Sequence, residues 1–362
     1  MPIYMDLHII PGVKAKEVAE AHRRDLLIQD EHTCNCMTYW IDEKRGNVFC
    51  LIEAPTANDV VEMHNKAHGL IPHRIIEVSP SLVESFLGRI SDPEDATTSA
   101  EGLKIFSDPS FRVLLAVKTE DPVLLQHRIG KEKAGELLQH VNQLIKKEIT
   151  LQDGIEAEHA GTGFIASFTS AAKAVACALA VQNKIIRHDI TVSTGVNAGE
   201  PVTNSGQFFG ETIQLAEQIG SLAGKKQIAI STSVKELISK DNLGNKPRDI
   251  VILSKNDETL LHLLFNKLEE RWQDENFNVS DYCHIMAMSS SQLYRKTIEI
   301  TGFSPNKLLK EFRLEKAKEL MKKGQYNISQ ITFDCGFTSP SYFTKCFKKK
   351  YGLLPMAYLD LL

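Results

Sequence analysis

Two histidines four residues apart, His64 and His68, have a spacing that suits metal chemistry. In a helix this spacing places both imidazoles on one face, where they can chelate a single ion. A zinc protease motif requires glutamate directly after the first histidine, and the chain has Asn65 there, which excludes that activity. The alternative is that both are ordinary surface histidines, because one such pair is weak evidence.

Further donor side chains lie earlier in the chain. Asp6 and His8 alternate onto one face of an expected strand, and His22 projects from an expected helix, so either element can supply additional ligands. Cys34 and Cys36 form a C-x-C pair of soft donors, which carries less weight because it stands alone.

A second kind of chemistry is indicated by two similar segments, residues 278–305 and 327–355. Each contains a short amphipathic helix pattern, a turn, and a second helix that opens with serines and ends at a glycine followed closely by proline. This is the order of a helix-turn-helix, whose second helix enters the major groove of DNA. Ser289 is expected to cap the second helix of the first segment, and Gly336 to form the turn of the second.

The side chains expected to face DNA are hydroxyls, amides and cations, which suit base edges and phosphates. They are Ser290, Ser291, Gln292, Arg295 and Lys296 in the first segment, and Thr338, Ser339, Ser341, Tyr342 and Lys345 in the second. Residues 305–324 carry apolar side chains at helical spacing, which predicts a long helix between the two segments. Ordinary helical bundles can share this packing, but the tandem repetition favours DNA recognition.

The elements that must position the histidines follow a β-α-β-β-α-β pattern over residues 1–85, which predicts a ferredoxin-like sandwich. Residues 86–104 are acidic and rich in small side chains, and predict a linker. Residues 105–266 alternate strand and helix patterns, with TLLHLLF (259–265) among the expected strands, and predict an α/β domain. Residues 267–362 predict an all-α domain, so the whole chain is expected to be a multidomain α+β protein.

The C-terminal segment resembles the DNA-binding domain of the AraC family of bacterial transcription regulators. The resemblance covers residues 267–362 and rests on FSPNKLLKEFRLEKAKELM, GFTSPSYFTKCFKKKYG and the closing Pro355. Thr332 departs from the family, which usually has alanine there. The resemblance implies sequence-specific binding of double-stranded DNA through a double helix-turn-helix.

The N-terminal segment resembles a small family of bacterial ferredoxin-like proteins described as nickel-binding. The matching residues are MPIYMDLHIIPG, EAHRRDL, MTYWIDEKRGNVFCLIEAP and MHNKAHGLIPHRIIEV, within residues 1–79. The resemblance implies His8, His22, His64 and His68 as candidate ligands of a divalent metal. Imidazole suits nickel, zinc and copper alike, so the ligands leave the element open, with nickel or zinc expected.

The middle segment resembles the class III adenylate and guanylate cyclase domain in GTGFIASF, TGVNAGEPV and GETIQLAEQI followed by GKKQIAIS. That family holds two metal ions with paired aspartates, and uses asparagine and arginine on a helix. The positions that match these residues are occupied by Val117, Thr162, Gln214 and Gln218. All four are uncharged, so we expect no cyclase activity, and the domain would serve dimerisation or bind a small molecule.

Charge and composition agree with this division. From Lys267 onward there are 15 Lys and Arg against 11 Asp and Glu, a net of +4, so the rest of the −4 chain carries −8. A basic segment suits a DNA reader, whose affinity depends on phosphate neutralisation. No apolar run approaches the roughly 20 residues that span a bilayer, and the N-terminus lacks a secretion signal, so a cytoplasmic location with seven reduced cysteines is expected.

These observations predict a cytoplasmic, homodimeric transcription regulator. Its DNA binding would respond to a metal at the N-terminal domain, or to a small-molecule effector at the middle domain. Two rival interpretations stay open. One is a nucleotide cyclase fused to a DNA-binding domain, and the other is a metal-buffering protein.

Overall fold

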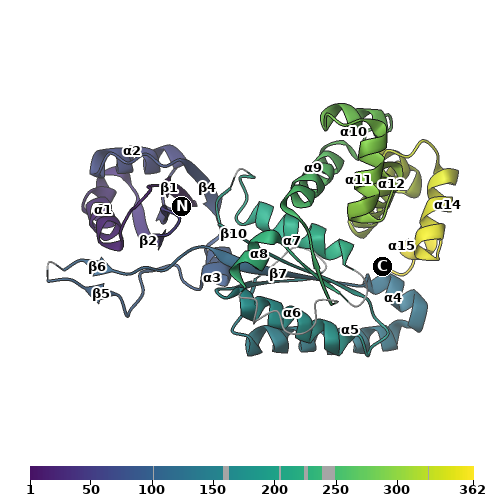
Figure 1. Ribbon diagram of the computed structural model, residues 1–362, viewed down its shortest axis with the longest axis horizontal. Coiled ribbons are helices and arrows are strands. Elements are labelled where there is room, and N and C mark those ends of the chain that lie inside the picture. Colours follow the sequence, from purple (N-terminus) through teal and green to yellow (C-terminus); the bar gives the residue numbers. More distant parts are fainter. Residues whose placement is uncertain (101, 158–162, 204, 224–226, 239–248, 325) are drawn as a thin grey trace.

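The computed structural model describes residues 1–100, 102–157, 163–203, 205–223, 227–238, 249–324 and 326–362. Three domains follow one another along the chain, and the two ends of the molecule lie on opposite sides of a central sheet (Figure 1). The predicted multidomain class is confirmed, with sheet in the first two domains and helices in the third. None of the described helices combines the length and apolar character needed to cross a membrane.

The N-terminal domain has the predicted β-α-β-β-α-β order. Its elements are β1 (Ile3–Ile9), α1 (Ala15–Ile28), a 3₁₀ turn (Gln29–His32), β2 (Asn35–Asp42), β3 (Asn47–Glu53), α2 (Ala57–Ala67) and β4 (Arg74–Val78). The sheet order is β2-β3-β1-β4, with neighbouring strands antiparallel. Thr56 caps α2 by accepting from the backbone N–H of Asp59, which fixes the start of the helix that carries His64 and is followed directly by His68.

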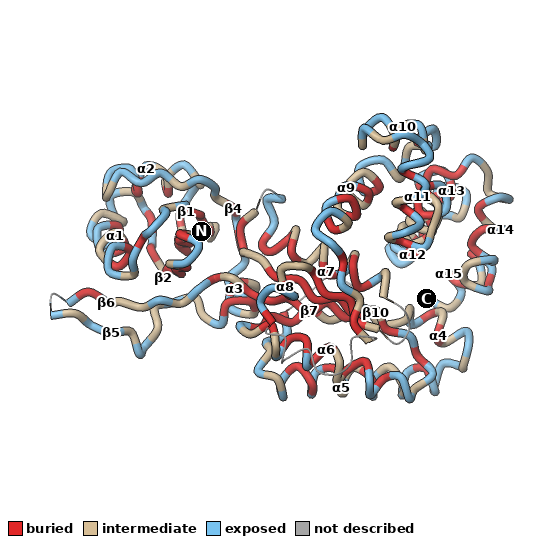
Figure 2. The backbone as a smooth tube through the Cα atoms, viewed as in Figure 1, coloured by how far each residue is buried: buried red, intermediate tan, exposed pale blue. Residues whose placement is uncertain are grey.

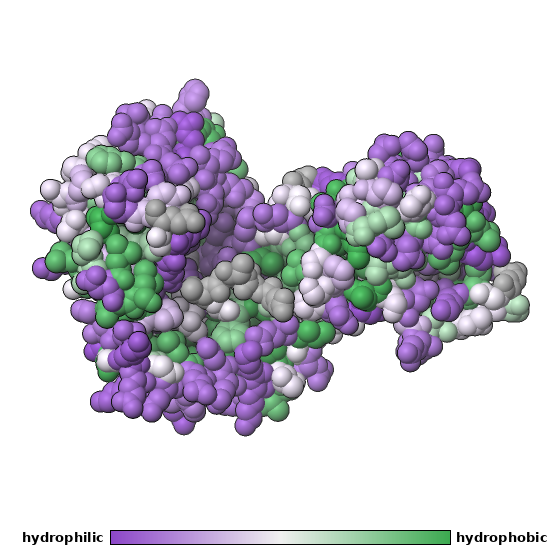
Figure 3. Space-filling model, turned by 180° about the vertical axis from the view of Figure 1, so that it is seen from behind, coloured by the Kyte–Doolittle hydropathy of each residue, from purple (hydrophilic) through white to green (hydrophobic). Residues whose placement is uncertain are grey.

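Each face of this sheet has its own apolar core. Val18, Val60 and Met63 from the two helices pack against one face. The other face is covered by α3 (Pro80–Leu87), whose Phe86 stacks on Phe209 of the middle domain. In the space-filling view from behind, hydrophobic residues gather where the first domain meets the rest of the molecule (Figure 3).

Helix α3 is also held by polar contacts to the middle domain. The buried guanidinium of Arg112 donates to the carbonyls of Phe86 and Leu87, and the hydroxyl of Ser167 also donates to Phe86. The carbonyl groups at the end of a helix have no partner within it, so these donors satisfy them. Within the segment predicted as a linker, Arg89 lies over the ring of Trp40, and a short hairpin, β5 (Thr97–Thr98) and β6 (Lys104–Ile105), follows.

The middle domain is built on a six-stranded mixed sheet of order β12-β11-β10-β7-β9-β8. Its strands are β7 (Arg112–Thr119), β8 (Ile155–Ala157), β9 (Phe164–Phe168), β10 (Val192–Gly199), β11 (Ile228–Ile230) and β12 (Ile250–Ile252). Its helices are α4 (Pro122–Ile129), α5 (Lys131–Leu151), α6 (Ala171–Ile185), α7 (Gly210–Leu222) and α8 (Thr232–Leu237). Helices α5 and α6 cover one face, α7 covers the other, and the central strands between them are mostly buried (Figures 1 and 2).

The C-terminal domain is all helical, as predicted. Its helices are α9 (Lys255–Arg271), α10 (Val279–Ile285), α11 (Ser290–Thr301), α12 (Pro305–Lys322), α13 (Ile328–Asp334), α14 (Pro340–Tyr351) and α15 (Pro355–Leu359). The expectation of a strand over residues 259–265 is wrong, because these residues lie within α9. Leu260, Leu264 and Leu268 recur at helical spacing on its buried side, and the run itself was too short to reveal that period.

The C-terminal domain contacts the middle domain on two sides. Leu261 of α9 packs with Ile219 of α7 in an apolar cluster. On the other side, Asp121 at the start of α4 accepts hydrogen bonds from Lys322 at 2.9 Å and from the Tyr358 hydroxyl at 3.0 Å. The first helix-turn-helix is therefore attached mainly by apolar packing, and the second also by a charged contact.

Candidate metal centre and nucleic-acid interface

Seven polar side chains converge between the sheet of the N-terminal domain and its two helices. They come from four elements: Asp6 and His8 from β1, His22 and Asp25 from α1, Cys50 from β3, and His64 with His68 from α2 and its end. Six of them, all except His68, are at least nine-tenths buried. Buried polar side chains normally have hydrogen-bond partners, so we expect the members of this group to bond to one another.

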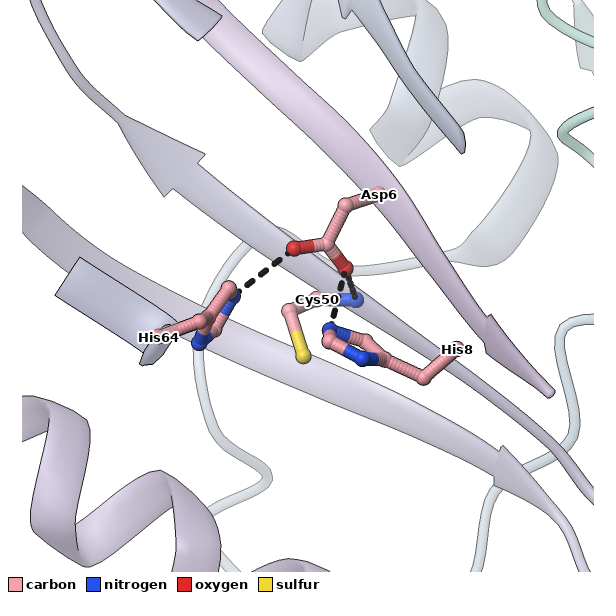
Figure 4. A group of neighbouring side chains, drawn as sticks. All are labelled: Asp6, His8, Cys50 and His64. Atoms are coloured by element: carbon pink, nitrogen blue, oxygen red, sulfur yellow. Dashed lines mark hydrogen bonds and ion pairs between the residues drawn. The ribbon is translucent and has the colours of Figure 1, made fainter. Parts of the chain in front are cut away.

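His64 lies at the centre of this group, between two carboxylates. Its Nε2 is 2.8 Å from Asp6 Oδ2, and its Nδ1 is 3.0 Å from Asp25 Oδ1. Asp6 also accepts from the backbone N–H of Cys50 and lies 3.5 Å from His8 Nε2, so it links β1, β3 and α2 (Figure 4).

The most compact set of potential ligands is Asp25, His64 and His68. His68 Nε2 lies 3.1 Å from His64 Nδ1 and 3.2 Å from Asp25 Oδ1, so the three atoms form a nearly equilateral triangle. Ligand atoms about 2.0–2.1 Å from a tetrahedral ion lie roughly 3.3 Å from one another. This triangle therefore already has the size of one face of a metal coordination shell.

A second group of donors lies on the other side of the His64 ring. Asp6, His8, Cys50 and His64 each offer one atom, and these atoms lie within 4.8 Å of one another. Figure 4 shows the Cys50 thiol between the two imidazoles, below the carboxylate of Asp6. This set is looser than the triangle, and it uses the opposite nitrogen of His64.

The charges of the group are strongly coupled. Burial opposes the charged form of His64, but the carboxylates of Asp6 and Asp25 more than compensate and raise its pKa to about 10. Burial likewise opposes ionisation of Asp6 and Asp25, and the facing histidines outweigh it and hold the pKa of both carboxyls below the usual range. Burial raises the pKa of the Cys50 thiol well above its ordinary value. Without metal, the site is therefore an imidazolium between two carboxylates.

The four predicted histidines are not equivalent in the structure. His64 and His68 are adjacent, and the His8 ring centroid lies 5.0 Å from that of His64. His22 lies next to Tyr39 and 3.9 Å from Asp92, outside both donor groups. Burial lowers its pKa, which is the reverse of the shift at His64.

Sequence reasoning missed Asp25 and Cys50. Asp25 lies in the charged run HRRD, which reads as helix surface, but it follows Val18 and His22 at helical spacing on the buried side of α1. A carboxylate on that apolar face was the available signal. Cys50 lies opposite Asp6 across two paired strands, and only the strand register brings them together. Of the C-x-C pair, Cys36 contacts Met63 through sulfur at 3.6 Å.

The candidate nucleic-acid interface consists of the two second helices of the C-terminal domain, α11 and α14. Ser289 caps α11 and Ser339 caps α14, each accepting from a backbone N–H three residues on. Gly336 lies in the preceding turn with φ of 70°, and a Cβ there would lie 2.7 Å from the Trp272 carbonyl oxygen, so the turn requires glycine.

Most of the side chains expected to face DNA are exposed to solvent. The exposed ones are Ser290, Ser291, Gln292, Arg295, Thr338, Ser341, Tyr342 and Lys345. Ser339 is half-buried because it caps α14. Lys296 is also half-buried and lies 3.0 Å from Glu299 and 4.0 Å from Asp257 of α9. Its ammonium is therefore shared with carboxylates of the protein.

Three of the four residues that match the catalytic positions of the cyclase family lie in described parts of the middle domain. Val117 is buried in β7 and packs in the core beneath α5 and α6. Gln214 and Gln218 are half-buried on α7, where the Gln218 side-chain oxygen is enclosed without a hydrogen-bond partner among the described residues. Thr162 lies outside the described residues.

Both terminal domains match family models. Residues 4–78 match the model described as nickel responsive protein SCO4226-like, and residues 282–360 match the model described as a helix-turn-helix domain. Histidine kinase P4 of Formosa agariphila is 38% identical over 112 residues, which are 31% of this chain and 8% of that protein. The HTH-type transcriptional activator RhaS of Mannheimia succiniciproducens is 33% identical over 89 residues, 24% of this chain and 33% of that protein. The chain thus spans a third or less of these two curated relatives.

Two solved structures are similar to parts of the chain. SCO4226 from Streptomyces coelicolor A3(2) has 30% sequence identity, and the match covers 21% of this chain and 94% of that one with a TM-score of 0.20. An adenylate/guanylate cyclase/hydrolase from Silicibacter pomeroyi has 21% identity, covering 38% of this chain and 83% of that one with a TM-score of 0.33. The two family models alone show that residues 4–78 form an SCO4226-like domain and that residues 282–360 form a helix-turn-helix domain of the AraC type.

Proposed function

We propose that the protein is a transcription regulator that binds specific double-stranded DNA, and that a divalent metal at its N-terminal domain modulates this binding. The observation that carries the first part is the pair of capped helices, α11 and α14, with exposed hydroxyl, amide and cationic side chains. Helix α12 connects them, as two readers of successive DNA segments require.

For the metal, the triangle of Asp25, His64 and His68 is the position that fits best. Two imidazole nitrogens and one carboxylate oxygen at 3.0–3.2 Å from one another suit nickel or zinc, and nickel agrees with the description of the family model. Asp6 would orient His64 through its other ring nitrogen, as carboxylates commonly do for histidine ligands. His8 and Cys50 extend the donor set on that side, and when bound the ion supplies a fixed double positive charge.

A continuous chain of contacts supports modulation of DNA binding by this site. The sheet that carries Asp6 and Cys50 packs on α3, which Arg112 fixes to the middle domain. The middle domain in turn contacts α9 through Ile219 and the second helix-turn-helix through Asp121. Metal would act by favouring one arrangement of these rigid parts over another, and the effect equals its difference in affinity for the two.

The experiment first selects DNA ligands from a random-sequence pool with the full chain, and then measures their affinity at fixed salt. Affinity is compared with Ni²⁺, with Zn²⁺ and with chelator, for the wild type and for His68→Ala. We expect a metal-dependent change of affinity in the wild type that His68→Ala removes. Selection of no sequence overturns the regulator, and identical affinities in all conditions overturn the sensing part.

The middle domain is proposed to have no catalytic role, because Val117, Gln214 and Gln218 offer no carboxylate for a metal ion. Conversion of ATP or GTP with Mn²⁺ would overturn this and favour the fused cyclase. Chromatin immunoprecipitation with sequencing separates a regulator, with sharp peaks near a few genes, from a metal buffer. The homodimer and the small-molecule effector stay predictions, which ultracentrifugation and ligand screening test.

A further inference from the structure

A pocket opens beside the proposed metal position, between β1, β3 and α1. Its volume is about 260 Å³. Most of its wall is aliphatic, supplied by Ile10, Val13, Val18, Ala21, Val48 and Leu70. Glu17 and Leu70 are exposed and mark its mouth. A concave, mainly apolar pocket with a few convergent polar groups is the usual form of a small-molecule site.

Apart from Glu17 at the mouth, the polar groups of this pocket belong to the metal centre or its surroundings. Asp25 and His68, two of the three residues in the compact triangle, line it. His8 and Cys50 of the second donor group line it too, as does His22, which lies outside both groups. An ion held by Asp25, His64 and His68 would have three protein ligands, and its remaining coordination position would be reached from the pocket. Zinc sites that act on other molecules have this form, while purely structural ones are closed by four protein ligands.

We propose that this pocket binds a small apolar molecule, about two fused rings in size, whose uncharged nitrogen head ligates the bound metal. The inference rests on the proposed metal site and names its ligand class. Size follows from volume, since an apolar cavity of roughly 150 Å³ takes up benzene and this one is larger. The head must be uncharged because the two negative charges of Asp6 and Asp25 already balance a divalent ion. A charged ligand would add a buried charge without a partner.

The probes are benzimidazole and indole, which have nearly the same shape. Only benzimidazole has a free nitrogen lone pair that can ligate a metal. Each is titrated calorimetrically into the full chain, loaded with Ni²⁺ or stripped by chelator. We expect benzimidazole to bind the loaded protein at least roughly tenfold more tightly than indole, and to shift the visible absorption of the bound Ni²⁺. With chelator, the difference between the two probes should vanish.

Ala21→Phe tests the location by filling the pocket from α1 while every proposed metal-ligating residue is kept. We expect it to abolish benzimidazole binding while the Ni²⁺ stoichiometry stays unchanged. Ala57→Phe is the matched control, because Ala57 is a half-exposed helical alanine outside the pocket lining, and it should bind as the wild type does. The absorption shift of the wild type gives a readout that does not depend on either variant folding.

The outcomes distinguish a failure of the pocket inference from a failure of the proposed metal site. If Ni²⁺ binds but benzimidazole gives neither heat nor an absorption shift, the pocket inference is wrong and the metal site stands. Equal binding of indole and benzimidazole to the loaded protein overturns the ligating head. Benzimidazole binding that survives Ala21→Phe places the ligand elsewhere and also overturns the inference. If Ni²⁺ itself does not bind, the proposed metal function fails first.

Discussion

The two ends of the molecule keep their polar side chains in opposite environments. In the N-terminal domain, Asp6 and His64 are 0% and 1% exposed, and each is bonded to another member of the cluster. In the C-terminal domain, Tyr342 is 49% exposed, and Arg295 and Lys345 point to solvent. Buried polar groups must be satisfied inside the protein, whereas exposed ones are free to meet a partner.

This difference predicts that folding and function are inseparable at one end and separable at the other. Removing a member of the N-terminal cluster leaves its partners buried without compensation, so stability and metal binding fall together. Removing a side chain from α11 or α14 leaves water to replace it, so only DNA binding falls. The following predictions test this contrast from its largest expected effect to its smallest.

The largest effect is expected for His64→Ala. It removes the central partner of the buried Asp6 and Asp25 carboxylates and leaves them only His8 and His68, which we expect to cost about 3–5 kcal/mol of unfolding free energy and to abolish metal binding. Trp40 and Trp272 are the two tryptophans of the chain, so Trp272→Phe leaves Trp40 as a fluorescent reporter of the N-terminal domain during urea unfolding. A cost below about 1 kcal/mol would show that the cluster is not the stabilising unit described.

Alkaline pH should weaken the same domain. The pKa of His64 is raised from 6.5 to about 10, so below about 6.5 both the folded and unfolded chains hold the proton and the contribution is complete. Between these values only the folded chain holds it, and stability falls by at most about 1.4 kcal/mol per pH unit. Above about 10 the contribution is gone.

The measurement is urea unfolding of metal-free protein across this pH range, followed through Trp40. His127→Gln, which alters an exposed histidine of α4, should keep the wild-type profile. A stability that stays constant from pH 7 to pH 10 would contradict the imidazolium between two carboxylates.

An exception at the C-terminal end sharpens the contrast. The Asp121 side chain is 8% exposed, and burial opposes its ionisation, but Lys318 and Lys322 outweigh it and lower the pKa of the carboxyl. Asp121→Asn keeps the cap of α4, because asparagine caps as well as aspartate, but removes the charge that faces both lysines. We expect hydrogen exchange at the Tyr358 amide to rise by an amount equal to about 1.5–3 kcal/mol of local stability. Unchanged protection would mean that apolar contacts alone hold this unit.

The smallest effects on folding are expected on the reading faces. Arg295→Ala and Lys345→Ala should each weaken binding to a selected DNA ligand by about 1–3 kcal/mol, while urea unfolding stays within about 0.5 kcal/mol of the wild type. Lys133→Ala removes the same charge from an exposed site on α5 and serves as the control. If Lys133→Ala weakened DNA binding by the same amount, the losses in Arg295→Ala and Lys345→Ala would reflect only the change in net charge.

Sequence pattern predicted the exposed end of the molecule better than the buried end. Helical spacing separates the inward Leu293 and Phe343 from the outward Arg295 and Lys345 without any knowledge of tertiary contacts. Helical spacing does not predict that Lys296 is half-buried, because its partner Asp257 belongs to α9, which is distant in the sequence.

The buried site depends on pairings between elements that local spacing does not determine. His64 and His68 follow from one helix, but Asp25 must be placed by the packing of α1 on α2, and Cys50 by the register of β3 on β1. The same limit applies to residues 259–265, whose short apolar run suits a strand or a helix equally until its neighbours are known.

Helix α3 has a consequence for anyone who wishes to isolate the N-terminal domain. Its Phe86 packs in one apolar core with Trp40 on one side and Phe209 on the other, and its last carbonyls are bonded by Arg112. A fragment that ends in the acidic segment after Gly88 would expose the apolar surface of α3 that the middle domain covers in the full chain. The last carbonyl groups of α3 would then be hydrogen-bonded only by water. Such a fragment should self-associate on purification, so the smallest well-behaved piece carrying the histidines is expected to include the central sheet.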